Sequence, residues 1–164
     1  MKHRSIVRVG TGYDLHRLET GRSLIMAGIN IPYEKGLAGH SDADVVIHAV
    51  IDALLGAAGL DDIGQLFPDT DPKYKNIDSA VLLAEALRQV HQAGYTPVNI
   101  DVTIIAQQPK LAPHKRPMRE NLARTLGCDL SQVNVKAKTE EGLGFTGKKQ
   151  GIAAYAVCIV HKKV

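Results

Sequence analysis

The chain has 164 residues, of which 45% are apolar but only 4% aromatic, and its formal net charge is +3. This length suits one domain with an aliphatic core that buries roughly 70% of the unfolded surface, and the charge is too small and too scattered to indicate nucleic-acid binding. Cys128 and Cys158 lack paired spacing, which is typical of reduced thiols in a cytosolic protein.

The N-terminal half begins with strands. Residues 5–9 predict a short strand that delivers Asp14 and His16 at its end. Residues 24–31 are apolar, with Gly28 interrupting them and Pro32 ending them, which favours a strand or a hairpin. The basic residues 1–4 are not followed by an apolar signal core, and the longest apolar run, residues 153–160, is too short for a membrane span. We therefore expect a soluble cytoplasmic protein.

The first helix is predicted over residues 41–58, with Gly59 as its stop. Ser41 is a candidate cap, and Asp42 and Asp44 would favour the positive end of the helix dipole. Asp44, His48 and Asp52 are spaced so that they share one face. This stretch alone favours a polar helix face with one histidine satisfied by a neighbouring carboxylate. The following residues, 64–76, have no regular period and predict a long loop.

Helices and strands alternate in the second half. Asp78 or Ser79 can cap a second helix that ends at Gly94, and Pro113 can open a third that ends before Gly127. Strands are predicted over residues 98–106, 133–137 and 150–160, the last two joined by the glycine-rich segment 141–147. This order predicts a single α+β domain, residues 1–164, with a mixed sheet and helices packed on one face.

The last strand is apolar on both sides, from Ile152 to Val160. A strand of this kind must be covered on both faces. Helices would cover one face, and either another subunit or a third helix would cover the second, so the strand itself leaves the assembly open.

A candidate metal site comes from two segments. In an extended chain Asp14 and His16 point to the same side. One carboxylate and one imidazole, joined by a histidine from a helix, make a three-ligand zinc site with an open fourth position. Spacing alone does not choose between His40 and His48 as the third ligand.

The motifs together resemble one family. Gly-Thr-Gly-Tyr-Asp-Leu-His at residues 10–16, His-Ser-Asp-Ala-Asp-Val-Val-Ile-His-Ala at 40–49 and Asp-Ile-Gly-Gln-Leu-Phe-Pro-Asp-Thr-Asp-Pro at 62–72 are similar to the 2-C-methyl-D-erythritol 2,4-cyclodiphosphate synthases. Asp-Val-Thr-Ile-Ile-Ala-Gln at 101–107, Asn-Val-Lys-Ala-Lys-Thr at 134–139 and Gly-Phe-Thr-Gly at 144–147 continue the resemblance in the same order.

The resemblance implies a set of site residues. The zinc ligands fall on Asp14, His16 and His48, with Asp52 as an acceptor behind His48 or a partner for a nearby cation. His40 and Ser41 would contact phosphate at a helix N-terminus, Thr139 would stabilise the transition state, and Glu141 would hold magnesium or manganese across the diphosphate. The remaining substrate contacts would come from Leu15, Asp62, Ile63, Gly64, Phe67, Pro68, Asp69, Thr70, Asp71, Ala106, Gln107, Gln108, Pro109, Lys110, Leu111, Ala112, Lys138, Glu140, Phe145 and Lys148.

Different segments of that set are expected to contact different parts of the substrate. Residues 62–71 match the segment that holds the methylerythritol portion, although Asp69 and Asp71 alone would be turn formers beside proline. Residues 106–112 match the cytidine pocket, and residues 138–141 match the diphosphate-handling stretch. Lys138, Gly142 and Lys148 depart from residues frequent in the family; Lys148 keeps a charge where arginine is frequent but loses its bidentate geometry.

The implied activity is a phosphorus–oxygen lyase of the non-mevalonate isoprenoid pathway. It would convert 4-diphosphocytidyl-2-C-methyl-D-erythritol 2-phosphate into the cyclodiphosphate and CMP, as a homotrimer with Zn2+ and Mg2+ or Mn2+ and with sites between subunits. The sequence offers no activated-serine elbow and no catalytic cysteine pairing, which fits an intramolecular attack by the substrate's own phosphate. The alternatives are a zinc-dependent phosphohydrolase and a non-catalytic trimer that binds isoprenoid diphosphates or nucleotides.

Overall fold

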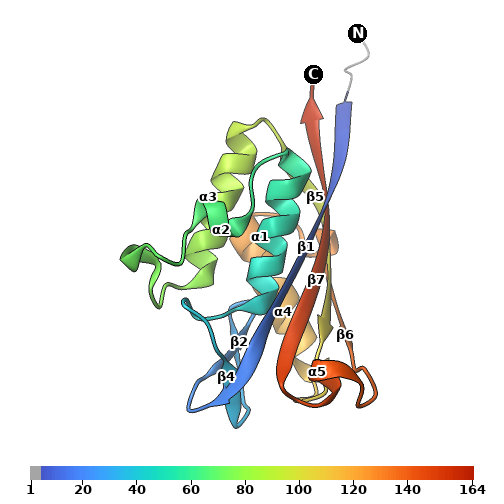
Figure 1. The fold of residues 1–164 in the computed structure, drawn as a ribbon. Coiled ribbons are helices and arrows are strands. Elements are labelled where there is room, and N and C mark those ends of the chain that lie inside the picture. Colours follow the sequence, from blue (N-terminus) through green and yellow to red (C-terminus); the bar gives the residue numbers. More distant parts are fainter. Residues whose placement is uncertain (1–4) are drawn as a thin grey trace.

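A five-stranded mixed sheet forms one layer of the fold, and the helices form the other (Figure 1). The computed structural model describes residues 5–164, so the basic start at residues 1–4 lies outside the described part. The strands follow the order β4 (Lys35–Leu37), β1 (Ser5–Thr20), β7 (Gly151–Lys163), β5 (Thr96–Ile105) and β6 (Val133–Lys138). Neighbouring strands are antiparallel except β5 and β6, which are parallel. The prediction of an α+β domain with a mixed sheet is confirmed.

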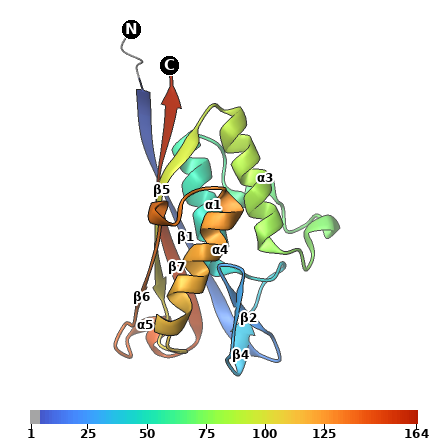
Figure 2. The same ribbon diagram turned by 180° about the vertical axis from the view of Figure 1, so that it is seen from behind.

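The three long helices cover one face of this sheet, as predicted; they are α1 (Val45–Ala58), α3 (Ser79–Gln92) and α4 (Lys115–Leu126). Figure 2 shows the same two layers from behind, with all three helices on one side. Shorter helical turns lie in the connections: α2 (Ile63–Leu66), α5 (Gly144–Gly147) and 3-10 turns at Pro72–Tyr74, Ala112–His114 and Leu130–Gln132. Among residues 5–164, no helix combines the length and the hydropathy that crossing a membrane requires.

The side chains of β1 and β7 alternate between the helix layer and the open face. On β7, Ile152, Ala154, Ala156, Cys158 and Val160 are buried under the helices. The open face carries apolar side chains that one chain leaves exposed: Val7, Val9, Tyr13, Leu15 and Tyr155. Tyr13 and Tyr155 are direct cross-strand partners. The last strand is therefore apolar on both sides, and the helices cover only one of them.

Two glycines on β1 allow α1 to lie directly on the strand. A Cβ atom at Gly12 would stand 1.9 Å from the carbonyl oxygen of Ala49, and one at Gly10 would stand 2.0 Å from that of Ala53. No side chain fits at such separations, so the backbone of α1 approaches β1 more closely than any residue other than glycine permits. This contact brings His48 on α1 next to the strand that carries Asp14 and His16.

The apolar stretch at residues 24–31 forms a hairpin, the second of the two alternatives that the sequence left open, with β2 (Leu24–Met26) and β3 (Ile29–Ile31) joined by a two-residue turn. Both turn residues, Ala27 and Gly28, have positive φ angles of 52° and 71°. The turn lies against the start of α1, where the side chain of Asp44 accepts hydrogen bonds from both of its amides at 2.9 and 2.6 Å.

Several predicted boundaries were wrong. The first strand does not stop at residue 9 but continues to Thr20, because it pairs with β7 without interruption from Ser5 to Arg17. Helix α1 starts at Val45 rather than at Ser41, and Asp44 caps it. The predicted loop at residues 64–76 overlaps α2 and contains a 3-10 turn. Strand β4 was not predicted, since three residues give no periodic signal.

Candidate active site

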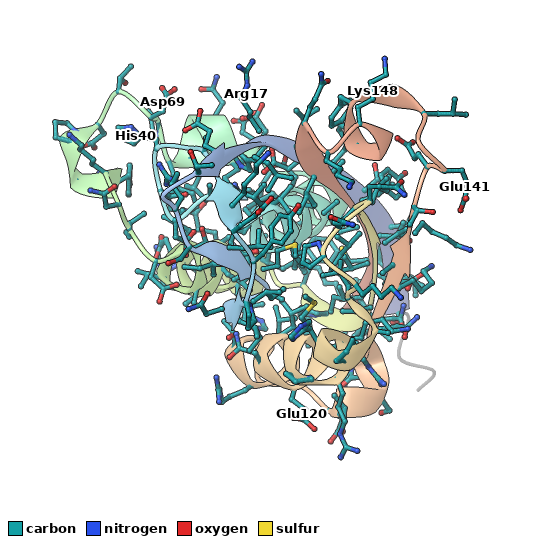
Figure 3. The ribbon with its side chains drawn as sticks, turned by 90° about the horizontal axis from the view of Figure 1, so that it is seen from below. Arg17, His40, Asp69, Glu120, Glu141 and Lys148 are labelled. Atoms are coloured by element: carbon teal, nitrogen blue, oxygen red, sulfur yellow. The ribbon has the colours of Figure 1, made fainter. Side chains whose placement is uncertain are left out.

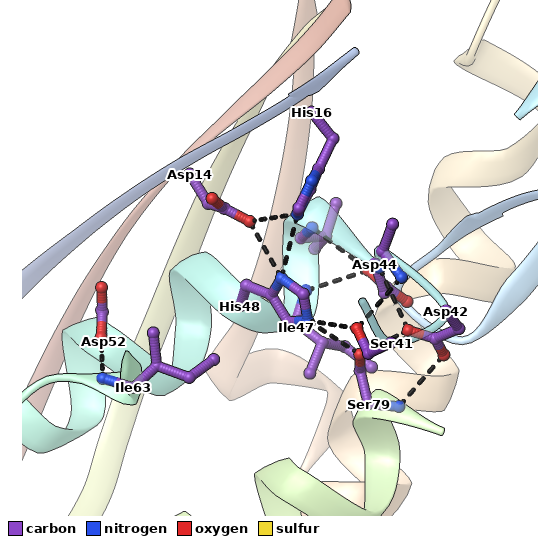
Figure 4. Close-up of polar contacts among 12 residues, drawn as sticks. Asp14, His16, Ser41, Asp42, Asp44, Ile47, His48, Asp52, Ile63 and Ser79 are labelled. Atoms are coloured by element: carbon purple, nitrogen blue, oxygen red, sulfur yellow. Dashed lines mark hydrogen bonds and ion pairs between the residues drawn. The ribbon is translucent and has the colours of Figure 1, made fainter. Parts of the chain in front are cut away.

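Asp14, His16 and His48 converge at the junction of β1 and α1 (Figure 4). Asp14 and His16 are two residues apart on β1 and share its helix-facing side, while His48 projects from the first turn of α1. The Oδ2 atom of Asp14 lies 2.9 Å from Nε2 of His16 and 3.0 Å from Nδ1 of His48, and the two nitrogen atoms are 3.2 Å apart. One oxygen and two nitrogen atoms thus point at a common position.

The electrostatics of these groups follow from their closeness. Burial raises the pKa of Asp14, but the imidazole rings of His16 and His48 beside its carboxylate outweigh this effect and lower the pKa from 3.8 to about 2. Burial lowers the pKa of His16, yet the hydrogen bond and the charge of Asp14 raise it more, so the net shift is upward from 6.5. Asp14 is therefore a carboxylate at neutral pH, and the cluster is organised around its negative charge.

The start of α1 is built around buried Asp44. Its carboxylate accepts hydrogen bonds from the amides of Val46 and Ile47 within the helix and from the two hairpin amides described above. These contacts occupy the amides of Val46 and Ile47, so these two amides are not free to bind an anion at this helix N-terminus. His40 and Ser41 instead lie in the segment that precedes the helix.

Asp52 does not stand behind His48 as an acceptor. Its Oδ1 accepts a hydrogen bond from the amide of Ile63 at 2.8 Å (Figure 4), which holds α2 against α1. The ring of His48 contacts Ser79 and Ser41 instead, with its Nε2 atom 2.9 and 3.2 Å from the two hydroxyl oxygens. The sequence suggested Ser79 only as a possible helix cap and did not connect it with the site.

A cavity of about 370 Å3 opens beside the cluster. Its walls combine both histidine motifs with part of the segment expected to hold the methylerythritol portion. They include His16, His40, Ser41, His48, Ile63, Gly64, Phe67 and Asp69. Pro68, Thr70 and Asp71 are not among its lining residues. Asp62 caps α2 through Gln65, and Asp71 caps the following 3-10 turn and pairs with Lys73.

A second cavity, of about 260 Å3, lies at the ends of β5 and β6. It gathers most of the segment expected to bind cytidine, together with the first diphosphate residues. Its lining includes Ala106, Gln107, Pro109, Lys110, Leu111, Ala112, Lys138 and Thr139. Gln108, which precedes a cis proline, is not part of this lining. This cavity shares no lining residue with the first one.

The acidic end of that stretch forms a turn. Glu141 has a positive φ of 51°, and its carboxylate accepts a hydrogen bond from the Thr139 hydroxyl at 2.6 Å. Glu140 accepts a hydrogen bond from the hydroxyl of Thr146, which ties it to α5. In Figure 3 Glu141 lies far across the molecule from His40 and Asp69. Within one chain, the structure therefore does not bring Glu141 to the histidine cluster.

Leu15, Phe145 and Lys148 line a third cavity, of about 590 Å3. It shares His16 with the first cavity, and it is strongly basic, with Arg17, Lys35 and Lys149 beside Lys148. The sequence did not single out Arg17, Lys35 or Lys149, because isolated surface cations give no local signal.

Comparison with known proteins shows which family this chain resembles. The YgbB family matches residues 7–161. A 2-C-methyl-D-erythritol 2,4-cyclodiphosphate synthase from Clostridium perfringens is 58% identical over 156 residues, which cover 95% of this chain and 100% of that protein.

Solved structures show the same similarity. The bifunctional IspDF from Campylobacter jejuni matches with a TM-score of 0.94 and 44% identity, covering 97% of this chain and 43% of that longer chain. A 2C-methyl-D-erythritol-2,4-cyclodiphosphate synthase in its CDP-bound form matches with a TM-score of 0.86 and 40% identity, covering 93% of this chain and 99% of that one.

Proposed function

The chain belongs to the YgbB family of 2-C-methyl-D-erythritol 2,4-cyclodiphosphate synthases, and from this we infer that it is a cyclodiphosphate synthase of the non-mevalonate isoprenoid pathway. Its substrate is 4-diphosphocytidyl-2-C-methyl-D-erythritol 2-phosphate. The 2-phosphate attacks the β-phosphorus of the same molecule, a new P–O–P bond closes the ring, and CMP leaves with the electron pair of the bond that breaks. No protein nucleophile takes part, so the chain contributes positioning and charge.

The observation that carries this proposal is the convergence of Asp14, His16 and His48 on the wall of a cavity. One carboxylate oxygen and two imidazole nitrogens, 2.9 to 3.2 Å apart, are the donor set of a catalytic zinc site that keeps a position for substrate. The side chains are mostly buried, with exposed fractions of 27, 19 and 12%. The residues present therefore fit zinc, which when bound would act as a Lewis acid toward a phosphate oxygen.

The neighbouring residues are proposed to hold the substrate around that position. His40 is exposed and Ser41 is buried on the same cavity wall, and we assign both to phosphate contact. Ile63, Gly64, Phe67 and Asp69 line the adjoining space for the methylerythritol portion. We assign cap roles to Asp62 and Asp71, because their carboxylates already accept backbone hydrogen bonds.

The nucleotide end is proposed to bind in the second cavity. Ala106 to Ala112 would surround the cytidine, and Lys138 and Thr139 would approach the diphosphate. A single exposed carboxylate, that of Glu141, with the Thr139 hydroxyl beside it, fits a magnesium or manganese ion that phosphate groups largely hold. Lys148 and the basic cavity around it offer further charge to the phosphates.

The separation of the two cavities supports a site completed by a second subunit. The cavity at the histidine cluster and the cavity at the ends of β5 and β6 have no lining residue in common. The open sheet face also carries exposed valine, leucine and tyrosine side chains. We propose a homotrimer in which these faces meet and each active site joins the histidine cavity of one subunit to the nucleotide cavity of its neighbour.

The decisive experiment follows product chemistry. The protein is incubated with the CDP-linked substrate and magnesium, and the products are identified by phosphorus NMR and mass spectrometry. CMP together with the cyclic diphosphate is the expected result. Inorganic phosphate would indicate a zinc-dependent phosphohydrolase, and binding without turnover would indicate a carrier of nucleotides or isoprenoid diphosphates.

The two free cysteines, Cys128 and Cys158, fit the reducing cytoplasm, where we expect this chemistry to take place.

A further inference from the structure

Behind His48, on the side away from Asp14 and His16, lies a chain of buried polar contacts (Figure 4). Nε2 of His48 is 2.9 Å from the hydroxyl oxygen of Ser79, which is fully buried. The same hydroxyl donates to Oδ1 of Asp42 at 2.5 Å. Asp42 is thus linked to His48 through the hydroxyl of Ser79. Asp42 lies in the segment before α1, and Ser79 is the first residue of α3.

The direction of these hydrogen bonds follows from counting donors. The carboxylate of Asp42 also accepts from the amides of Asp44 at 3.1 Å and Ser79 at 3.0 Å, so it acts only as an acceptor. The Ser79 hydroxyl has one hydrogen atom, and that hydrogen points to Asp42. The hydroxyl oxygen then has only lone pairs to offer His48, and Nε2 must carry the proton.

A proton on Nε2 leaves the neutral ring with a lone pair on Nδ1. This is the nitrogen atom that faces Asp14 Oδ2 at 3.0 Å and His16 Nε2 at 3.2 Å. The Ser41 hydroxyl lies 3.2 Å from the same Nε2 atom. It accepts from the amide of Ala43 with one lone pair and has a second lone pair for the Nε2 hydrogen. A lone pair aimed at a carboxylate is unfavourable unless a cation lies between them.

We propose that Ser79 and Asp42 are positioning residues that fix the tautomer and the ring orientation of His48, so that its Nδ1 lone pair faces the metal. This inference rests on the proposed metal site. Outer partners of this kind typically change metal affinity by 10- to 100-fold when they are removed. This relay, which runs from Asp42 through the Ser79 hydroxyl to His48, also couples the first residue of α3 to the cluster on β1 and α1.

The relay is separable from the capping of α3. Asp78 is the cap of that helix, and its side chain accepts from the amide of Ala80 at 2.8 Å. Asp42 accepts from the backbone amide of Ser79, a contact that survives when the hydroxyl is removed. The variant Ser79→Ala therefore deletes the relay while the helix start keeps its backbone hydrogen bonds.

The test compares Ser79→Ala and Asp42→Asn with the wild-type protein and with Asp78→Ala. Zinc affinity is measured by competition with a chelator, and the protonated nitrogen atom of His48 is identified by 15N NMR of the histidine rings. Both relay variants should lose about 10- to 100-fold in zinc affinity, and the Nε2–H signal of His48 should shift or vanish. Asp78→Ala should weaken α3 but leave both readouts as in the wild type.

The outcomes separate the two levels of inference. If the wild-type protein does not bind zinc, the proposed metal site is wrong. If the wild type binds zinc and both relay variants keep its affinity within threefold with an unchanged Nε2–H signal, the relay does not position His48, and this proposal is overturned alone. In Asp42→Asn the amide can donate to the Ser79 oxygen and release the hydroxyl hydrogen toward His48, so a switch to the Nδ1–H tautomer would be direct support.

Discussion

At the scale of single residues, the three residues proposed as zinc ligands differ in how far the sequence could identify them. Asp14 and His16 are readable from alternation alone, because side chains two apart on a strand share a face. His48 could be chosen over His40 only from the folded structure, since the packing of α1 on Gly10 and Gly12 brings His48 within 3.2 Å of His16. Ser79 and Asp44 were invisible as partners, because their contacts join segments distant in sequence.

Replacing His48 by alanine tests the metal site directly. The variant loses one of three donor atoms, so we expect it to lose tightly bound zinc and activity, measured by atomic emission and by CMP release. The fold should survive, because the ring lies on a cavity wall and is not part of the aliphatic core. His40→Ala should keep its zinc, since His40 is not part of the cluster. Full zinc content in His48→Ala would instead show that the ligand set is wrong.

Glu141→Gln separates the two metals. Zinc content should not change, whereas turnover should fall on the order of 100-fold, because one contact to developing phosphate charge is lost. Glu140 is not an inert comparison, since it accepts the hydroxyl of Thr146. The exposed Glu120 on α4 is the better control, because it pairs with Arg116 and lies well away from Glu141, His40 and Asp69 in Figure 3. Zinc loss in Glu141→Gln would contradict this assignment.

The buried carboxyl group of Asp44 should make the free energy of unfolding depend on pH. Burial raises the pKa of Asp44 from 3.8 to about 6, although backbone donors lower it. A carboxyl whose pKa is higher in the folded state binds its proton there first, so stability falls as pH rises from about 4 to about 6 and is constant above that range. At about 1.4 kcal/mol per pKa unit, the change approaches 3 kcal/mol.

The measurement compares urea unfolding of the metal-free wild type and Asp44→Asn between pH 4 and 7. Carboxylates that do not interact with Asp44 titrate in both proteins and cancel in the difference, whereas the charge of Asp42 acts on Asp44 and contributes to it. The stability difference, wild type minus variant, should shrink as pH rises and then level off near pH 6. A difference that grows with pH would mean that the four backbone donors outweigh burial and that Asp44 is charged throughout.

At the scale of elements, periodicity located the long helices and failed at their junctions. The cap of α3 at Asp78 was among the predictions, and its end at Gln92 lies two residues before the predicted stop at Gly94, because both depend on local capping signals. The length of β1 was underestimated, because its pairing with β7 joins segments that are distant in sequence. Gly10 and Gly12 permit a close approach between β1 and α1, which only the folded structure displays.

Gly12→Ala tests that approach. Its new methyl group would stand 1.9 Å from the carbonyl oxygen of Ala49, so α1 must move away from β1. We expect a loss of roughly 1–3 kcal/mol or more in unfolding free energy, together with weaker zinc binding as His48 shifts. Gly56→Ala is the matched control on α1, because its Cβ would have no neighbour closer than 4.0 Å, and it should be neutral or stabilising. Equal behaviour of the two variants would show that the contact is not tight.

At the scale of the whole molecule, the open face of the sheet decides whether one chain can form the site. The sequence indicated a two-sided apolar strand at β7 but could not say which side the helices take. In the structure Ala154 and Ala156 face the helices and are buried, so glutamate at either position should unfold the chain rather than dissociate an oligomer. Tyr155 and Val157 face outward, and they are the positions at which assembly can be tested.

Tyr155→Glu places a charge at the centre of the proposed subunit contact, opposite Tyr13 on β1. Tyr155 is 41% exposed in one chain, so the folded monomer should tolerate glutamate, whereas the trimer would bury an unpaired charge, a strongly unfavourable arrangement. We expect sedimentation to show a trimer for the wild type and monomers for the variant, with an unchanged circular dichroism spectrum. Val81→Glu replaces an exposed apolar residue on α3, in the helix layer, and should remain trimeric.

If the active site joins two cavities from different subunits, zinc binding should persist in the Tyr155→Glu monomer while turnover is lost. A wild-type protein that sediments as a monomer, or a monomeric variant with full activity, would show instead that each chain carries a complete site.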